Sequence, residues 1–360
     1  MINLLQPDAC GPAVQTVPSD PGRDWLKDPL CAVEAAPDND GDPSPDAQWS
    51  AQAVRTGVCG VVAPRIIRLP GGFYRMYYTQ ILPRSGFPAG AADYANATAR
   101  ILSAVSTDCE TWTMEPGVRL TARDGGAGEF RVGSSEVVPL LNGNGRLRMY
   151  YECSVGPLPV DTAIRSAISV DGGLVWTPEP GVRFGATNRG FATPRLQFIE
   201  DGSCRLYCGE LGRGIVSARS DDGGQTFVEE PGVRIAADGP YDAATAYAPE
   251  ILRVAGGAHV MYYAGYETGD RAHILRAESA DGLNWRKDPW PVISPAAGWL
   301  DSAKCSEMCV ATLPPAAGGR LRYRLYYEAC DGTVANRRGV WRIVSATAGE
   351  RAGDRIRNLP

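Results

Sequence analysis

Six side chains able to do chemistry occupy related places in five similar segments of this chain, and we expect them to converge. They are three carboxylates, two guanidinium groups and a phenol: Glu136, Glu250, Glu307, Arg65, Arg195 and Tyr247. Carboxylates confined together repel one another, so one is held protonated while another stays ionised, as acid/base catalysis requires. Guanidinium groups beside them would pair with the acids or bind an anionic ligand group. Because buried charges are seldom unpaired, the alternative is a set of mutual salt bridges that fills the space.

The segments that carry these groups form a fivefold repeat. Each copy has an apolar stretch, a turn that contains glycine, and a strand that in four copies ends on a Tyr-Tyr pair, as in VVAPRIIRLPGGFYRMYY. The copies align on Pro64, Pro139, Pro194, Pro249 and the equivalent Val310. Successive anchors lie 55 to 75 residues apart. Repeats of that length made only of strands are typical of radial arrays of four-stranded sheets. The sequence thus predicts an all-β fold, a five-bladed β-propeller of four-stranded antiparallel blades that start near residues 60, 135, 190, 246 and 305.

A second phrase follows the third strand of the first four blades. In it an aspartate precedes an aromatic residue across a turn of small residues, and the four aspartates are Asp108, Asp171, Asp222 and Asp281. Such a carboxylate can accept hydrogen bonds from the backbone of its own turn while the ring packs between sheets. The phrase resembles the Asp-box hairpin of sialidases. We expect these aspartates to brace turns and not to catalyse.

The fifth copy of this phrase lies at the start of the chain. Residues 19–33 match residues 279–293, with Trp25 aligned on Trp285. We therefore expect residues 19–33 to form the outermost strand of the blade built by residues 305 to 347, which would close the ring and cover its sheet edges. This arrangement leaves one domain, residues 1–360.

Composition and charge argue against two classes of binding partner. The net charge of −5 and acidic pI near 5.3 argue against nucleic acid and anionic membranes. No apolar stretch is long enough to span a bilayer, and the opening MINLLQPDACGP does not read as a secretory signal. Several cysteines fall inside expected strands, where thiols pack well. We expect a cytoplasmic protein with reduced cysteines, and the sequence indicates no oligomeric state.

Signals for metals and cofactors are weak. The two histidines, His259 and His273, have no partner at zinc-binding spacing, and there is no phosphate loop or dinucleotide fingerprint. We expect no metal and no cofactor. A small molecule is the expected substrate.

Side-chain alternation along the first strand of each blade selects the groups that face the channel. Counting from the anchor residues, the channel set includes Arg65, Arg195 and Glu250 at one depth, each directly after its proline, with Val61, Leu140 and Phe191 as an apolar wall. Asp242 and Asp301, in the segments that lead into blades four and five, complete the expected substrate-binding set.

These repeats resemble the five-bladed glycosidase clan of arabinanases, xylosidases, invertases and levansucrases over nearly the whole chain. The resemblance implies a catalytic aspartate directly before the first-blade proline, another at the same place in the second blade, and an acidic glutamate further round. This sequence has Ala63 and Val138 at the first two places, and Thr193, Ala248 and Cys309 at the equivalent ones. The family's carboxylates therefore do not carry over, and any chemistry has moved.

Three functions remain. The first is a glycosidase-like enzyme, hydrolytic or transferring, for a small polar substrate that could be anionic, with Glu250 as the principal acid/base, Glu136 or Glu307 assisting and Tyr247 alongside. The second is a non-hydrolytic acid/base enzyme of specialised metabolism, such as a cyclase, lyase or isomerase, on a repurposed propeller. The third is a propeller that binds a ligand without catalysis.

Overall fold

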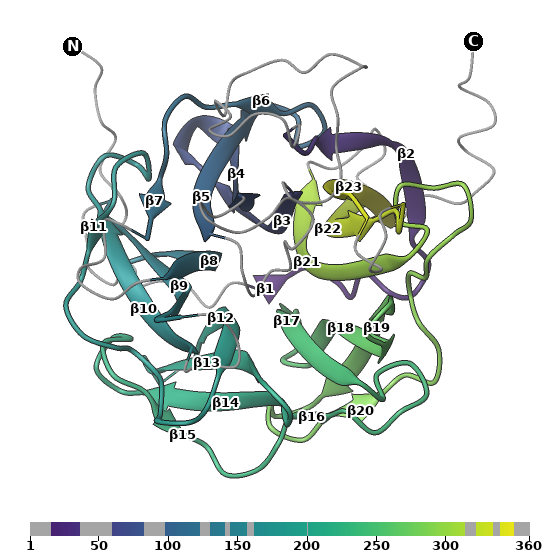
Figure 1. Ribbon diagram of the computed structural model, residues 1–360. Coiled ribbons are helices and arrows are strands. Elements are labelled where there is room, and N and C mark those ends of the chain that lie inside the picture. Colours follow the sequence, from purple (N-terminus) through teal and green to yellow (C-terminus); the bar gives the residue numbers. More distant parts are fainter. Residues whose placement is uncertain are drawn as a thin grey trace.

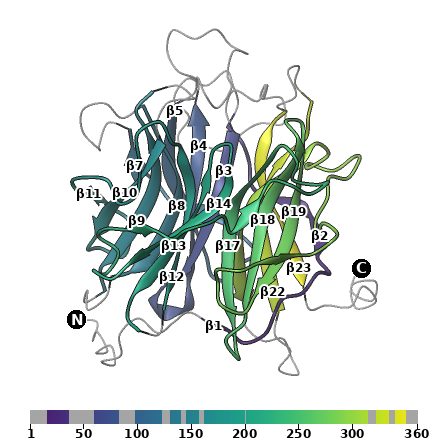
Figure 2. The same ribbon diagram turned by 90° about the horizontal axis from the view of Figure 1, so that it is seen from below.

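The strands radiate around a central axis (Figure 1). The structure is a computed structural model that describes residues 16–36, 60–82, 98–122, 130–140, 145–156, 162–199, 201–313, 322–333 and 339–348. Seen from the side, the long strands of each blade run roughly along the axis (Figure 2). Among the residues described, no helix has the length and apolar composition that crossing a membrane requires.

Each blade is an antiparallel sheet whose first strand is innermost. Blade 1 contains β3 (Gly60–Arg68), η1 (Pro70–Gly72), β4 (Tyr74–Leu82), β5 (Thr98–Ser106), β6 (Thr113–Met114) and β7 (Leu120–Thr121). Blade 2 contains β8 (Arg131–Pro139), β9 (Leu147–Ser154), β10 (Thr162–Ser169) and β11 (Thr177–Pro178). Blade 3 contains β12 (Phe191–Phe198), β13 (Cys204–Glu210), β14 (Gly214–Ser220), β15 (Val228–Glu229) and β16 (Ile235–Ala236).

The last two blades share one continuous sheet in the hydrogen-bond pattern. Blade 4 contains β17 (Thr245–Val254), β18 (His259–Thr268), β19 (Arg271–Ser279) and β20 (Arg286–Lys287). Blade 5 contains β21 (Lys304–Leu313), β22 (Arg322–Cys330), β23 (Trp341–Ala348) and β2 (Leu26–Val33). A single parallel pair, Ala272 with Lys304, joins the two blades, and β1 (Thr16–Val17) pairs with the end of β17.

The N-terminal segment closes the ring, as the sequence predicts. β2 pairs with β23 in antiparallel fashion, Leu26 opposite Thr347 and Val33 opposite Ile343. The expected all-β, five-bladed propeller is confirmed, with β2 as the outer strand of the last blade.

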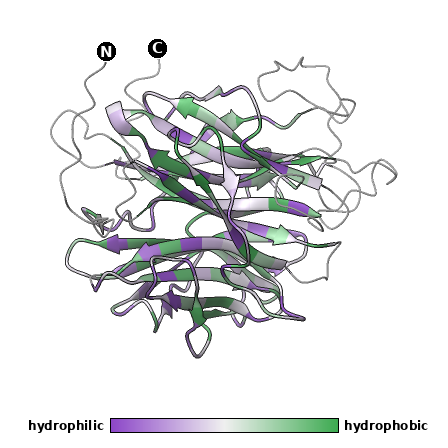
Figure 3. Ribbon diagram, turned by 90° about the vertical axis from the view of Figure 1, so that its left-hand side faces the viewer, coloured by the Kyte–Doolittle hydropathy of each residue, from purple (hydrophilic) through white to green (hydrophobic). Residues whose placement is uncertain are grey.

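The tyrosine pairs hold neighbouring blades together. In every blade one phenol donates a hydrogen bond to a turn carbonyl of the next blade: Tyr77 to Gly173, Tyr150 to Gly224, Tyr207 to Gly282, Tyr262 to Gly22 and Tyr326 to Cys109, at 2.5 to 3.0 Å. These tyrosines are fully buried, so both faces of each second strand lie in the core between blades. Along the strands, hydrophobic and hydrophilic residues are interspersed (Figure 3).

The predicted turn aspartates accept backbone hydrogen bonds from their own turns. Asp171 Oδ1, for example, accepts from the N–H groups of Leu174 and Val175, both at 3.1 Å. The aromatic residue of the same turn, Trp176, packs edge-on against Tyr77 of the preceding blade. Each turn therefore supports the blade-to-blade contact described above.

Candidate functional site

Every inner strand carries an irregularity that sets the direction of the channel side chains. Pairing between the first and second strands skips two residues in each blade. In the first four blades a residue of this bulge has a positive φ: Ala63 (57°), Ser134 (44°), Thr193 (54°) and Ala248 (53°). Such angles are uncommon for residues other than glycine, and a bulge shifts the face on which later side chains lie. Simple alternation from the anchor residues therefore fails across it.

Beyond the bulge, one position in each blade stands opposite the tyrosine that bonds to the next blade. The five residues at this position are Arg65, Glu136, Arg195, Glu250 and Cys309. Glu136 thus lies at the depth of Arg65 and Glu250, because Ser135 and not Pro139 takes the place of Pro64. The sequence alignment of blade 2 on Pro139 was wrong for this reason, and so was that of blade 5 on Val310, where Met308 is equivalent.

Four of these residues form a belt of ion pairs across the channel, and together with the Cys309 thiol we call them the ion ring. Arg65 binds Glu136 at 2.6 Å and Glu250 at 2.9 Å, and Arg195 binds Glu250 at 3.2 Å. The ring acceptors also take backbone N–H groups of other blades: Glu136 from Leu196, Glu250 from Val310, and the Cys309 thiol from Ile66.

The contacts of the ion ring favour a structural role for Glu250, Glu136, Arg65 and Arg195. The two carboxylates and Arg195 are at most 3% exposed. Glu250 already makes two ion pairs and accepts one backbone hydrogen bond, which leaves it poorly placed to exchange a proton with a substrate. The salt-bridged alternative weighed from the sequence is therefore the one that the geometry supports at this depth.

A second carboxylate cluster lies nearer the N-terminal ends of the inner strands. Glu307 is two residues before the ring position, the place of Ala63, Ser134, Thr193 and Ala248 in the other blades. Across the bulge of Ser306 and Glu307, between the pairs Cys305 with Ala329 and Met308 with Tyr327, stands Glu328 of β22. Both carboxylates are buried, at 3% and 5% exposure. Two glutamates of one blade therefore face each other.

Their hydrogen bonds differ. Glu328 accepts from the Ser306 hydroxyl at 2.5 Å, the Tyr247 phenol at 3.3 Å and the Ala63 N–H at 3.2 Å. Glu307 accepts from the Ser134 hydroxyl at 3.2 Å, while its other oxygen has no hydrogen bond and lies 3.6 Å from Arg195. Three donors favour the ionised form of Glu328.

The electrostatics separate the two groups further. Burial raises the pKa of both carboxyls. The pKa of Glu307 rises to about 8, through burial first and then through the negative charge of Glu328. Burial and the charge of Glu328 thus favour the protonated form of Glu307, whereas three hydrogen bonds favour the ionised form of Glu328. This is the division into an acid and a base that proton-transfer chemistry needs.

Further polar groups surround the pair. Tyr247 and Tyr266 have ring centroids 5.6 Å apart, and burial raises the pKa of both phenols, so both remain protonated donors. Glu152 of blade 2 adds to the negative potential at Glu307. Lys304 lies over the Tyr266 ring, 5.6 Å from its centroid. Of the residues expected from the sequence, Glu307 and Tyr247 belong to this cluster.

Three expected binding residues lie in other surroundings. Asp242 accepts from Lys287 and Tyr263, and Asp301 from Lys27 and Tyr327, so both carboxylates are buried links between an outer strand and a tyrosine pair. Phe191 is fully buried in the core beside Phe184, with ring centroids 4.5 Å apart, because the bulge at Thr193 breaks the alternation used to place it. These three residues therefore have no part in the function proposed for the site.

Sequence reasoning missed Glu328 and Glu152, because it examined only the first strands. A signal was present: both glutamates directly follow a Tyr-Tyr pair, where the other blades have Thr79, Gly209 and Ala264. The second strands stand behind the inner ones, and at the bulge their side chains reach the cluster.

Comparisons with known proteins establish the fold. No family model matches the chain, and no curated protein matches it. A solved structure described as a glycoside hydrolase superposes with a TM-score of 0.64 at 16% identity, covering 91% of this chain and 94% of its own. A β-xylosidase gives 0.55 at 16% identity, with 82% and 94% covered. An exo-1,5-α-L-arabinanase from a bovine ruminal metagenomic library gives 0.54 at 16% identity, with 80% and 93% covered. The chain therefore has the fold of the propeller glycosidases that its repeats resemble.

Proposed function

We propose that this protein is a glycosidase-like enzyme, hydrolytic or transferring, whose acid/base chemistry resides on Glu307 and Glu328. The proposal rests on a buried pair of carboxyls on adjacent strands, whose surroundings favour a protonated Glu307 and an ionised Glu328. Glycoside cleavage requires one protonated and one ionised carboxyl. The likeness to glycosidase propellers supports this reaction class without specifying a sugar.

Each group of the cluster has a specific role in this mechanism. Glu307 donates its proton to the leaving oxygen, and Glu328 acts as the base or nucleophile. The Ser306 hydroxyl, the Tyr247 phenol and the Ala63 N–H orient Glu328 and stabilise its charge. Ser134 holds Glu307 toward the pair.

The substrate we propose is small, polar and uncharged. Arg65 and Arg195, the cations that could have bound an anionic group, are both occupied by carboxylates of the ion ring. Hydroxyl and phenol groups dominate what remains, and these suit the hydroxyls of a sugar.

The test uses a panel of p-nitrophenyl and methyl glycosides with Glu307→Gln and Glu328→Gln. A p-nitrophenolate leaves without protonation, so Glu307→Gln should retain much more activity on aryl than on methyl glycosides. Glu328→Gln should lose about a hundredfold or more on both. The exposed variant Asp221→Asn should match the wild type. Failure of the wild type on the whole panel, or equal losses of Glu307→Gln on both leaving groups, would refute the assignment.

One observation favours a second function. Glu307 and Glu328 stand on adjacent strands of one blade, whereas an acid and a base that flank a glycosidic bond usually act from two sides. Two groups on one side suit proton transfer along one face of a substrate, as in an isomerase or cyclase. Glycoside-inactive protein in which the pair still divides one proton would favour this alternative.

A further inference from the structure

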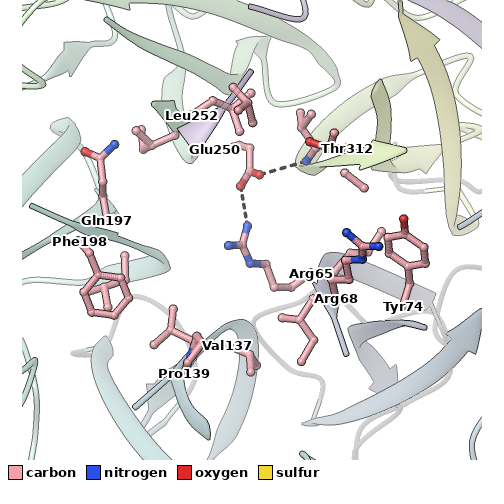
Figure 4. Close-up of a pocket in the computed structure, with 18 of the residues that line it drawn as sticks. Arg65, Arg68, Tyr74, Val137, Pro139, Gln197, Phe198, Glu250, Leu252 and Thr312 are labelled. Carbon is pink, nitrogen blue, oxygen red and sulfur yellow. Dashed lines mark hydrogen bonds and ion pairs between the residues drawn. The ribbon is translucent and has the colours of Figure 1, made fainter. Parts of the chain in front are cut away.

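A cavity lies on the other side of the ion ring. It has a volume of about 660 Å³ and is bounded by the C-terminal halves of all five inner strands. That volume is within the range of small-molecule sites, roughly 300 to 1,000 Å³. Arg65 and Glu250 form its floor, and their ion pair crosses it (Figure 4). The cavity is distinct from the cluster of Glu307 and Glu328, neither of which lines it.

The walls of this cavity are mainly aliphatic. Successive blades contribute branched or aromatic side chains, among them Ile67, Val137, Phe198, Leu252 and Leu313. Because each blade supplies such a residue, an apolar molecule would contact protein on every side. Burial of apolar surface would supply most of its binding free energy.

Two polar groups of the cavity remain available to a ligand. Gln197 is only 9% exposed, and its Nε2 has no hydrogen-bond partner. Its amide nitrogen is turned toward the interior of the cavity (Figure 4). A buried amide donor without a partner costs about 1 to 3 kcal/mol, which a ligand acceptor would recover. Arg68 is exposed and forms no ion pair with the described residues.

The charges of the lining favour an anion. Glu250, the acid on the floor, is neutralised by Arg65 and Arg195, which leaves Arg68 as a positive charge on the wall opposite the amide of Gln197 (Figure 4). An apolar wall with a cation on one side and an unsatisfied donor on the other is complementary to an amphipathic molecule whose single anionic head lies at the Arg68 side.

We infer that this cavity is a second ligand site, which binds a small amphipathic molecule with an apolar body and an anionic head. Arg68 neutralises the head, the aliphatic walls enclose the body, and Gln197 is available as a donor to the opposite end of the ligand. The ion ring separates this site from the candidate active site, so the two can be occupied independently. The inference does not depend on the proposed function.

The probe is 8-anilinonaphthalene-1-sulfonate, which combines an aromatic body with a sulfonate. We expect saturable fluorescence enhancement with one probe per chain. Arg68→Gln should weaken binding by about threefold to tenfold, the usual range for one exposed ion pair. Leu252→Trp, which fills the cavity, should weaken it more than tenfold. The control Glu307→Gln should bind as the wild type does.

Several results would overturn the inference. They are probe binding without saturation, equal affinity in a folded Leu252→Trp, or parallel loss in Glu307→Gln. Thermal melting of each variant establishes folding. If Leu252→Trp is unfolded, unchanged affinity in Arg68→Gln would contradict the site equally well.

Discussion

Replacing Glu250 by glutamine should destabilise the fold strongly. The substitution keeps the shape of the side chain but removes the charge that faces both Arg65 at 2.9 Å and Arg195 at 3.2 Å. The other carboxyl neighbour of Arg195, Glu307 at 3.6 Å, favours the protonated form and so does not replace the lost charge. Breaking a buried pair by neutralising one partner typically costs about 3 to 5 kcal/mol, because an uncompensated charge stays buried. We therefore expect a loss of that size in the free energy of unfolding of Glu250→Gln.

The expected shift in melting temperature follows from the chain length. An unfolding entropy of about 2.1 cal/mol/K per residue gives about 0.76 kcal/mol/K for 360 residues, so 3 to 5 kcal/mol lowers Tm by about 4 to 7 °C. Calorimetry or circular dichroism measures this. Asp221→Asn is the control, because its carboxylate is 75% exposed and its pair with Arg219 should contribute less than about 1 kcal/mol. A Tm for Glu250→Gln within a degree of the wild type would refute the structural assignment of the ion ring.

Three further predictions concern other parts of the molecule. Folding raises the pKa of the Glu307 carboxyl from 4.5 to about 8, so between these pH values the folded state binds one proton more than the unfolded state. The free energy of unfolding of the wild type should therefore fall by up to about 1.4 kcal/mol per pH unit across that interval. Chemical denaturation at several pH values measures this slope, and the contribution should be absent from Glu307→Gln. Asp171→Ala removes the acceptor of its turn and should lower stability by about 1 to 2 kcal/mol while activity at a permissive temperature survives; a folded but inactive variant would give Asp171 a catalytic role. Deleting residues 16–33 removes β2 and the carbonyl that accepts from Tyr262, so the exposed edge of β23 should cause aggregation in light scattering, whereas a monodisperse truncated protein with the wild-type Tm would contradict the closure.

The fold was predictable because its signals are local. The Tyr-Tyr pairs and the turn aspartates each recur in four of the five blades, and the match of Trp25 to Trp285 identifies the closing strand. One tyrosine of each second strand makes the same contact with the next blade, so the sequence of each repeat is enough to predict its strands and their packing. The structure adds the partner of each contact, such as the Gly22 carbonyl that Tyr262 binds.

The site was predictable only in part, because its register depends on backbone bulges. In blades 1, 3 and 4 a proline follows the bulge residue, and there Arg65, Arg195 and Glu250 were placed at one depth as found. In blade 2 the bulge is built from Ser134 and Ser135, and no proline marks its position in the sequence. Alignment on the nearest proline therefore moved Glu136 to the wrong depth.

Glu328 escaped prediction for a different reason. Its side chain reaches the cluster only because β21 bulges at Ser306 and Glu307, opposite it. The alternation of residues along a strand shows which face of the sheet each side chain occupies. It does not show that a bulge in the neighbouring strand opens a space into which a second-strand side chain extends. Glu307, in contrast, was expected in the channel from the first strand alone.

The proposed function requires that Glu307 is protonated and Glu328 ionised at neutral pH. The direct measurement is a pH titration of protein labelled with ¹³C at the glutamate side-chain carboxyl, followed by NMR, with resonances assigned from Glu307→Gln and Glu328→Gln. We expect the Glu307 carboxyl to titrate near 8, and at a lower pH in Glu328→Gln because the neighbouring charge is gone. A Glu307 carboxyl that is ionised at pH 6, in a protein that is otherwise folded, would show that Glu307 is not the acid.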